Sequence, residues 1–490
     1  MNTRLKKRAF PATALVNLML CIGLFLIVYG LLTDKPIVAL GAICAPIGII
    51  VIGYGFVNPR YTYILYTIYA YFFICFIRIL RHGGLSVGQD ILHIYMVCTL
   101  LFTIFLNRNS SYTIKNAANG LTICYLIWVV FILFQMLNPG TDSEGIVRGF
   151  RTLIVGNTIL YIVLSMLSNT PKFLKTFLIL WGILTVIAFL KLMYQRYVGF
   201  DQAEKYWLFA QGGSRTHIIS TGIRYFSVLS DAGNFGVNMG AMFIMYAIIS
   251  IYTKNKSLRL FFIAVAIMGL IGMLMAGTRS ALAVPFGGLA LYCLLCKNLK
   301  IFATTAIIGI LSFSFLAFTD IGESNSLIRR MRTAVRPNID ASFNVRKNNR
   351  VMIAEHLKDK PFGVGTYQSI PKLWSNDDGT YEEGTLPPDS YFVNMWIQHG
   401  IVGLLVHIFM YMLMLAWASY LILFRITNRQ LRQVMAAFIG TVFGILLNGY
   451  AGEGMGLPPT NLLLVALLAF AMNGPYIDKQ LTNENNNYIL

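Results

Sequence analysis

Apolar runs long enough to cross a lipid bilayer recur along almost the whole chain. Of its 490 residues, 57% are hydrophobic and only 12% are charged, whereas soluble domains have about 45–50% apolar and about 25% charged residues. A helix needs about 20 apolar residues to cross roughly 30 Å of hydrocarbon. Runs of suitable length are residues 10–32, 36–57, 61–80, 89–106, 118–138, 151–168, 172–195, 232–252, 259–277, 280–296, 299–318, 391–423, 433–449 and 459–474. We predict an all-α polytopic membrane protein with about 12–14 transmembrane helices.

The basic residues predict how the chain is oriented. Arg4, Lys6, Lys7 and Arg8 precede the first run, which ends without a small-residue cleavage site, so we expect a retained span and a cytoplasmic N-terminus. Counting from there places many lysines and arginines of the short connections in the cytoplasm, as the positive-inside rule requires. The resulting parts are a first helical region with a short outer segment, a large outer loop, and C-terminal helices with a cytoplasmic tail, at residues 1–318 (outer segment 196–231), 319–390 and 391–490.

Charge and cysteine usage exclude several functional classes. The net charge of +19 would suit nucleic acid, but no basic helix, zinc module or aromatic-basic sheet pattern accompanies it, so no nucleic-acid partner is expected. All seven cysteines lie in apolar runs, and the C-x-x-C of Cys293 and Cys296 lacks a second ligand pair. We therefore predict no outer disulfide, no metal and no cofactor. No acidic residue lies in the middle of a predicted span, which disfavours ion-coupled transport.

The series of apolar runs is interrupted between Asp320 and Asp389. This segment holds ten of the chain's 20 acidic residues and ten basic ones. Residues 329–350 carry seven basic residues against Asp340 alone, whereas residues 376–389 carry five acidic residues and no basic one. No other segment of the chain is large and polar enough to form a site outside the bilayer. We expect chemistry or recognition to take place here.

Two arginines outside this loop are also candidates for a site. Arg224 and Arg279 fall on the same predicted outer side, each within a segment that contains glycine and hydroxyl residues. Such arginines often extend to phospholipid head groups, which is one explanation for both. The other is a shared anion site, because a guanidinium presents a fixed fork of donors to two phosphate oxygens and keeps its proton.

The second half of the loop has its own pattern. Apolar positions in 350–360 predict a short amphipathic helix that ends before Pro361. The following residues 361–367 predict a turn in which Gly363 and Gly365 permit close backbone approach, or a turn that only returns the chain to the membrane. Asp389 stands where the next apolar run begins, which suits contact with a lipid-linked substrate, a helix N-cap, or both.

The order of these motifs resembles that of the O-antigen ligase and O-antigen polymerase superfamily. Its elements are Arg224 followed by Asp231 and Asn234, then Gly-Thr-Arg279-Ser-Ala-Leu, then a large outer loop with Arg350, Pro361-Phe-Gly-Val-Gly and a polar residue eleven before Gly-Ile-Val-Gly. The resemblance covers roughly residues 220–410. It implies a metal-independent membrane glycosyltransferase of the GT-C type, which moves an oligosaccharide from undecaprenyl diphosphate to a sugar hydroxyl on the outer face of the bacterial inner membrane.

The resemblance also implies roles for particular residues. Arg224 and Arg279 would hold the donor diphosphate and act in catalysis, because fixed cations stabilise the charge that builds on a departing diphosphate. Asp389 would accept a hydrogen bond from the attacking hydroxyl, as the third catalytic residue. Further candidates for binding diphosphate or glycan are Arg350, Arg346, Arg215 and Tyr391, and alternative general bases are Glu355, His356 and His399.

The acceptor is less constrained than the donor. Ligases of the superfamily typically carry His-Asn at the position where this chain has Asp389-Ser390, which favours a polymerase that joins lipid-linked repeat units of a surface polysaccharide. A ligase acting on lipid A-core or on protein, a lipid-linked glycan flippase or exporter, and a non-catalytic assembly scaffold remain alternatives. The expected partners are the undecaprenyl-linked donor, a glycan or lipid A-core acceptor, membrane lipids and other proteins of polysaccharide assembly.

Overall fold

The structure is a computed structural model of the chain. It describes residues 48, 50–81, 83–106, 112–219, 222–297, 299–324, 326–332, 341–375, 381–483 and 490. The predicted span at 10–32 and most of the one at 36–57 lie outside these residues. So do Arg336 and Asp340 of the basic half of the loop, and Asp377 and Asp378 of its acidic half.

The described residues form a bundle of apolar helices, and the all-α polytopic class is confirmed. Nine helical segments are long and apolar enough to cross a membrane: α3 (Pro59–Leu80), α4 (Ser86–Leu106), the continuous rod Ser143–Leu167, α8 (Pro171–Tyr197), α11 (Ala232–Tyr252), α12 (Lys256–Met275), α17 (Tyr391–Phe424), α18 (Arg429–Asn448) and α19 (Thr460–Asn483). The shorter apolar helices are α5 (Gly120–Gln135), Arg279–Leu295 and Phe302–Phe318. All twelve fall on predicted spans, although the rod begins eight residues earlier than its predicted start at residue 151.

Some of these segments are composite, and short elements connect them. The rod consists of α6 (Ser143–Gly149), a π-helix η3 (Phe150–Ile159) and α7 (Leu160–Leu167), and Arg279–Leu295 consists of η4 (Arg279–Leu282) and α13 (Ala283–Leu295) within the bounds given. Phe302–Phe318 belongs to α14 (Leu299–Phe318). The connecting elements are η1 (Gly83–Leu85), η2 (Ile114–Asn116), α9 (Gln202–Ala210), α10 (Ser214–His217), β1 (Ile218–Ile219), β2 (Gly222–Ile223), α15 (Ser326–Arg332), α16 (Ala341–His356), β3 (Pro371–Ser375), β4 (Tyr381–Thr385) and η6 (Gly454–Gly456).

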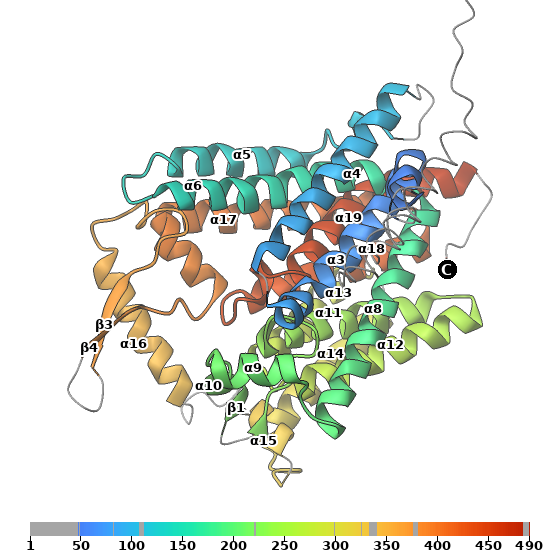
Figure 1. The fold of residues 1–490 in the computed structure, drawn as a ribbon. Coiled ribbons are helices and arrows are strands. Elements are labelled where there is room, and N and C mark those ends of the chain that lie inside the picture. The colour runs from blue at the N-terminus through green and yellow to red at the C-terminus, as the bar shows by residue number, and fades with distance from the viewer. Residues whose placement is uncertain are drawn as a thin grey trace, which may run out of the picture.

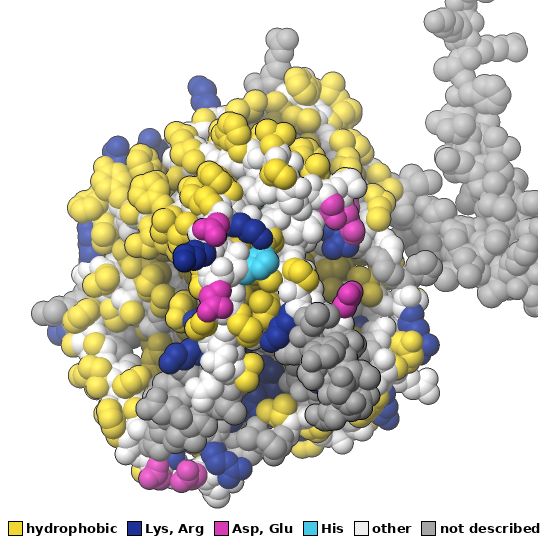
Figure 2. Space-filling model, turned by 90° about the vertical axis from the view of Figure 1, so that its left-hand side faces the viewer, with side chains coloured by type: hydrophobic (Ala, Val, Ile, Leu, Met, Phe, Trp, Pro, Cys, Tyr) yellow, Lys and Arg dark blue, Asp and Glu magenta, His cyan; other side chains and the backbone are white. Residues whose placement is uncertain are grey.

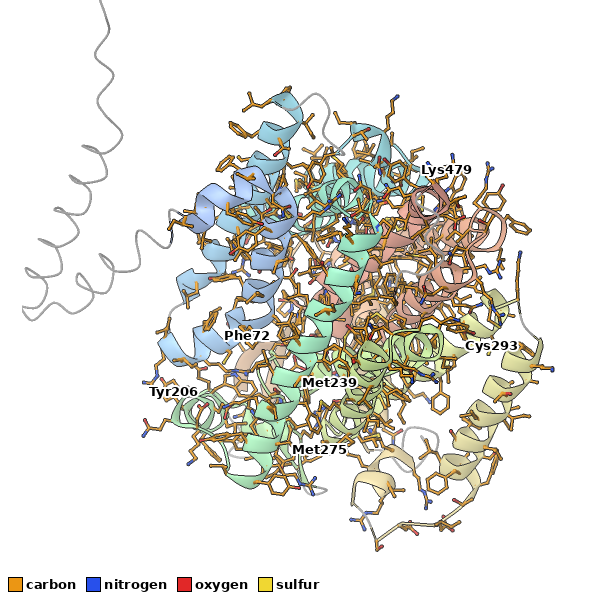
Figure 3. The ribbon with its side chains drawn as sticks, turned by 90° about the vertical axis from the view of Figure 1, so that its right-hand side faces the viewer. Phe72, Tyr206, Met239, Met275, Cys293 and Lys479 are labelled. Carbon is orange, nitrogen blue, oxygen red and sulfur yellow. The ribbon has the colours of Figure 1, made fainter. Side chains whose placement is uncertain are left out.

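The centre of the bundle is built from α11, α13 and α18, which approach one another closely. A Cβ atom at Gly444 would lie 2.2 Å from the carbonyl oxygen of Val284, and one at Gly440 would lie 2.7 Å from that of Gly288. Small residues at such crossings let membrane helices pack backbone to backbone. Met239 of α11 is fully buried and lies among the packed helices in Figure 3.

Most of the polar elements lie at one end of the bundle. Figure 1 shows α16 and the two antiparallel hairpins, β1–β2 and β3–β4, on the side where α9, α10 and α15 also lie. The face that carries α16 and β3–β4 presents basic and acidic side chains among apolar ones (Figure 2). The amphipathic helix predicted for 350–360 is found as α16, but it begins at Ala341 and ends at His356. The β3–β4 hairpin was not predicted.

A turn of the large loop inserts into a break in α17. Gly400 interrupts that helix with φ 66° and ψ −171°, a backbone region in which essentially only glycine is found. The break frees the carbonyl groups of Ile397 and Gln398, and these accept hydrogen bonds from Val364 N (2.9 Å) and Gly365 N (3.1 Å). Irregular backbone is tolerated at a helix break only when its polar groups find such partners.

The same turn also contacts the corner between α5 and α6. Gln135 donates to the carbonyl of Phe362 at 2.6 Å, and the amide of Thr366 donates to Oγ1 of Thr141 at 3.0 Å. A Cβ at Gly365 would lie only 2.7 Å from the backbone carbon of Gly140. The predicted close backbone approach at Gly363 and Gly365 is therefore present. The turn joins α5, α6, α16 and α17 at one point.

Substitution of Gly363 tests this insertion against a matched control. Gly363 and Gly212 have almost the same φ, 77° and 78°, but a Cβ at Gly363 would lie 2.5 Å from Gly400 N, whereas one at Gly212 meets nothing within 4 Å. We expect Gly212→Ala to cost about 1–2 kcal/mol of backbone strain and Gly363→Ala about 1–3 kcal/mol more through overpacking. Thermal unfolding of the purified variants in detergent measures both, and equal losses would contradict the insertion.

Candidate active site

Arg224 follows β2 at the polar end of the bundle and is held by backbone and hydroxyl groups. Its guanidinium donates from Nη1 to the carbonyl of Thr216 (3.0 Å) and from Nη2 to Oγ1 of Thr278 (2.9 Å). Nε is buried and has no hydrogen-bond partner. The predicted outer segment thus contributes an arginine whose direction is fixed from two sides while part of its hydrogen-bonding capacity is unused.

The segment around Arg224 is itself anchored by an aromatic cluster. The guanidinium of Arg78 lies 4.3 Å from the ring centre of Trp207 and 4.6 Å from that of Phe226. His217 is buried beside them, and its Nε2 accepts the amide hydrogen of Ala232 at the start of α11 (3.1 Å). Burial lowers the pKa of His217 to about 4, which keeps the imidazole neutral and able to accept this bond.

Arg279 stands on the neighbouring turn. Gly277, with φ 60°, ends the preceding helical segment, and η4 begins at Arg279. Thr278 ties this turn to α11 by donating to the carbonyl of Ala232 at 2.7 Å. A Cβ at Gly277 would lie 3.6 Å from Cγ of Arg224 and 3.3 Å from Nε of Arg330. The two turns that carry the predicted arginines are therefore in contact.

The large loop contributes a third arginine to this place. Arg346 on α16 donates to the carbonyl of Ala451 at 3.0 Å. The pKa of Arg224 is lowered, chiefly by burial; Asp231 opposes the shift, and the positive charges of Arg279 and Arg346 add to it. Like charges that perturb one another in a partly buried place are typical of anion sites. We call Arg224, Arg279 and Arg346 the arginine cluster.

Carboxylates lie beside the arginine cluster. Oδ2 of Asp389 accepts a hydrogen bond from Nδ2 of Asn349 on α16 at 3.0 Å. Partial burial raises the pKa of Glu453, although its side chain reaches solvent at the edge of the site. The negative charges of Asp231 and Asp389 raise this pKa further, and the positive charge of Arg346 opposes the shift. These three acids therefore share one electrostatic neighbourhood with Arg346. Glu453 was missed from the sequence, although an acid isolated between two apolar runs was a detectable signal.

Other predicted residues surround this centre. Arg350 donates to the hydroxyl (3.0 Å) and the carbonyl (3.1 Å) of Tyr450, and its guanidinium lies 4.7 Å from the ring centre. The residue that caps α17 is Ser390, whose Oγ accepts from Val393 N at 3.4 Å. The N-cap role considered for Asp389 therefore belongs to its neighbour, and the Asp389 side chain faces Asn349 instead.

The remaining candidates lie on α10, on α16 and inside α17. Arg215 and Glu355 are exposed on α10 and α16. His356 is exposed, with Nε2 2.9 Å from Nζ of Lys360. His399 is buried next to the rings of Trp128 and Phe131. Within the described part of the chain, none of the three alternative bases forms a hydrogen bond or ion pair with Asp389.

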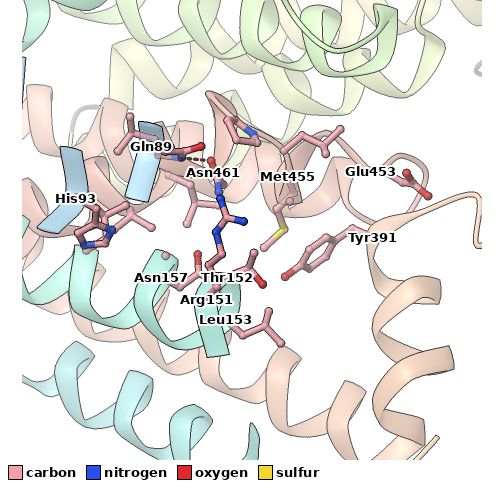
Figure 4. A pocket seen from close by; sticks show the side chains of 18 of the residues that line it. Gln89, His93, Arg151, Thr152, Leu153, Asn157, Tyr391, Glu453, Met455 and Asn461 are labelled. Carbon is pink, nitrogen blue, oxygen red and sulfur yellow. Dashed lines mark hydrogen bonds between the residues drawn. The ribbon is translucent and has the colours of Figure 1, made fainter. Parts of the chain in front are cut away.

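A cavity of about 440 Å³ opens next to the carboxylates. It lies between α3, α4, the π-helix η3, α17 and the start of α19, and Tyr391 and Glu453 line the part that adjoins the arginine cluster. In Figure 4, Arg151 extends into the cavity from η3, with His93 towards one end and Glu453 towards the other. Tyr391, a predicted substrate contact, donates to or accepts from Nε2 of His407 at 3.1 Å. The described residues contain no cluster of three or more metal-ligating side chains of the His, Cys, Asp and Glu types.

Comparison with known proteins matches part of the chain to one family. A family model described as O-antigen ligase matches residues 263–408, which include Arg279, Arg346 and Asp389 but not Arg224. No curated protein and no solved structure matches the chain significantly. The matched residues include the break in α17, the turn that inserts into it, and two of the three arginines of the cluster, Arg279 and Arg346. By this match, residues 263–408 of the chain are similar to the O-antigen ligase family.

Proposed function

We propose that this membrane glycosyltransferase joins lipid-linked oligosaccharides into a surface polysaccharide. The observation that carries the proposal is that Asp389 accepts a hydrogen bond from Asn349 (3.0 Å), one helical turn along α16 from Arg346 of the arginine cluster. The cluster would bind the diphosphate of an undecaprenyl-linked donor. A diphosphate needs several fixed cations, and arginines supply them without losing their protons.

The geometry suits a direct displacement at the donor sugar. The oxygen of an acceptor hydroxyl would attack the sugar carbon bonded to the diphosphate, and the bond from that carbon to the diphosphate oxygen would break. The leaving diphosphate takes the bonding electrons, so negative charge grows beside the arginine cluster, which stabilises the transition state more than the bound substrate. Asp389 would accept the proton of the attacking hydroxyl. Activation of the acceptor hydroxyl would therefore be the task of the large loop, at whose end Asp389 lies.

Location follows from the same proposal. Undecaprenyl-linked donors reside in the bacterial inner membrane, so the polar end of the bundle would face the periplasm and both termini the cytoplasm. The lipid chain of the donor would remain in the bilayer while its diphosphate reaches Arg279 at the end of the helices. Lipids of the membrane and other proteins of polysaccharide assembly would then surround the enzyme.

Asp389-Ser390, where ligases of the superfamily typically have His-Asn, favours a polymerase. The test uses the purified chain with undecaprenyl-diphosphate-linked repeat units and no other acceptor. A polymerase produces a ladder of products that differ by one repeat unit, which gel electrophoresis resolves. Reaction only after lipid A-core is added would contradict polymerisation and identify a ligase.

Removal of an arginine from the cluster tests the diphosphate site. We expect Arg279→Ala and Arg224→Ala each to lower the transfer rate by about 10²–10³-fold, the range for loss of one transition-state donor, at unchanged protein abundance in the membrane. Arg196→Ala is the matched control, because Arg196 is exposed at the same end of the bundle and its guanidinium lies 5.6 Å from the ring centre of Tyr197. Its transfer rate should equal that of the wild type. A normal polymer length distribution in either cluster variant would contradict the assignment.

Two substitutions of Asp389 separate its charge from its shape. The residue has φ 58°, which asparagine tolerates well and alanine does not, so Asp389→Asn preserves the backbone and one acceptor oxygen while removing the charge. If the carboxylate takes the proton, Asp389→Asn lowers kcat by about 10²–10⁴-fold and Asp389→Ala by at least as much. Single-turnover rates with saturating donor measure this. Wild-type rates for both variants would remove Asp389 from the site.

A further inference from the structure

The cavity beside the arginine cluster is chemically different from the cluster itself. Among the described residues that line it, the charged ones are Arg151, Asp90 and Glu453, so one arginine stands against two carboxylates. Nε of Arg151 donates to Oδ1 of Asp90 at 2.9 Å, and Nη2 lies 2.7 Å from Oδ2. A paired arginine in a cavity with an excess of carboxylate offers no attraction to a diphosphate. The cavity therefore suits an uncharged, polar ligand.

The lining residues match the chemistry of a sugar ring. Amide side chains with both donors and acceptors face the cavity, and they include Gln89, Asn157 and Asn461. The phenol ring of Tyr391 offers an apolar surface to the C–H face of a ring. A volume of about 440 Å³ lies within the about 300–1,000 Å³ of small-molecule sites.

One buried polar atom on the cavity wall has hydrogen-bonding capacity to offer a ligand. His93 of α4 lines the cavity and is only 4% exposed, yet its Nε2 has no hydrogen-bond partner. A buried polar atom normally has one, because leaving it unpaired costs about 1–3 kcal/mol. A sugar hydroxyl can donate to or accept from this nitrogen, depending on the tautomer.

The backbone that presents Arg151 is itself unusual. Phe150–Ile159 is a π-helix, a form that is rare and frequently found at functional sites. Its wider turns place Arg151, Thr152 and Asn157 on the cavity wall. The hydroxyl of Thr152 lies 2.5 Å from that of Tyr367, in the turn that inserts next to α17. The cavity wall and the large loop are thus in direct contact.

We propose that this cavity is a monosaccharide-binding subsite in which the Asp90–Arg151 pair, Asn157 and His93 select the sugar next to the reacting bond. The inference rests on the proposed function, since Glu453 connects the cavity to Asp389 and Arg346. Two sources supply such a sugar: the first residue of the lipid-linked donor and the terminal residue of the acceptor. The proposed experiment distinguishes them by varying the two substrates separately.

Gly156→Leu fills the cavity without removing a hydrogen-bonding side chain. A Cβ at Gly156 would meet only the carbonyl oxygen of Arg151, at 3.4 Å, so the leucine has room to extend. Asp90→Asn is the second variant, because it keeps the shape but breaks the ion pair. Gly309→Leu is the control, since a Cβ at Gly309 of α14 meets nothing within 4 Å. Thermal unfolding confirms that all three variants are folded.

Transfer is measured with the lipid-linked oligosaccharide that accumulates in cells lacking this chain, and with the same oligosaccharide released from its lipid as acceptor. We expect Gly156→Leu and Asp90→Asn to raise KM about tenfold or more, the equivalent of one lost charge-assisted hydrogen bond, while Gly309→Leu keeps wild-type values. A rise confined to the lipid-linked substrate assigns the subsite to the donor sugar, and a rise confined to the released oligosaccharide assigns it to the acceptor. Unchanged KM values for both substrates would overturn the proposal.

Binding measurements separate this proposal from the diphosphate site. Undecaprenyl diphosphate without sugar should bind Gly156→Leu as tightly as wild type and bind Arg279→Ala more weakly. In equilibrium binding, the released oligosaccharide should bind Gly156→Leu more weakly than wild type and bind Arg279→Ala as tightly as wild type. If wild type binds the oligosaccharide but transfers nothing, the proposed function fails and the subsite stands. If transfer is normal in Gly156→Leu, the subsite fails and the proposed function stands.

Discussion

The insertion of a loop turn into the broken helix α17 is the interaction on which the site depends. Gly400 interrupts the helix, and backbone amides of the turn donate hydrogen bonds to the carbonyl groups of Ile397 and Gln398 that the break leaves free. On its other side the turn is bonded to the corner between α5 and α6. Because the turn follows α16 directly, this anchorage fixes where α16 crosses the end of the bundle (Figure 1). In that position Arg346 acts on Arg224, and Asn349 donates a hydrogen bond to Asp389.

Electrostatics divides the polar end into two regions with different ligand preferences. Burial, together with the like charges of Arg279 and Arg346, lowers the pKa of Arg224, and this grouping of cations favours a multiply charged anion. The adjoining cavity pairs Arg151 with Asp90, which favours uncharged hydroxyl groups. Asp389 and Glu453 lie between the two regions. A diphosphate held in one region and a sugar in the other would place the bond between them next to Asp389, which is where the proposed displacement needs a proton acceptor.

Much of this arrangement could be predicted from the sequence, for identifiable reasons. Length and hydropathy alone predict transmembrane helices. The glycines of residues 361–367 predict a close approach of two backbones. The basic half of the loop does supply Arg346. The acidic half is described only in part, and its Glu383 is exposed on β4.

The rest depended on tertiary contacts that no local pattern carries. Glu453 and the Asp90–Arg151 pair come from segments that the motif order did not include, and only the fold brings them to the site. His399 packs against aromatic side chains of α5, and its role as a base stays a prediction. The π-helix at Phe150–Ile159 has no periodicity that distinguishes it from an ordinary span. Glu453, Asp90 and Arg151 could not be predicted because they lie far from the motifs in the sequence.

We propose that distant segments of the chain form one substrate site at the polar end of the bundle. The most direct measurement is a cryo-electron microscopy structure of the chain with its undecaprenyl-diphosphate-linked oligosaccharide bound. The account predicts diphosphate density in contact with Arg224, Arg279 and Arg346, with the adjoining sugars beside Asp389. Diphosphate density elsewhere in the protein, with the arginine cluster occupied only by solvent, would contradict it.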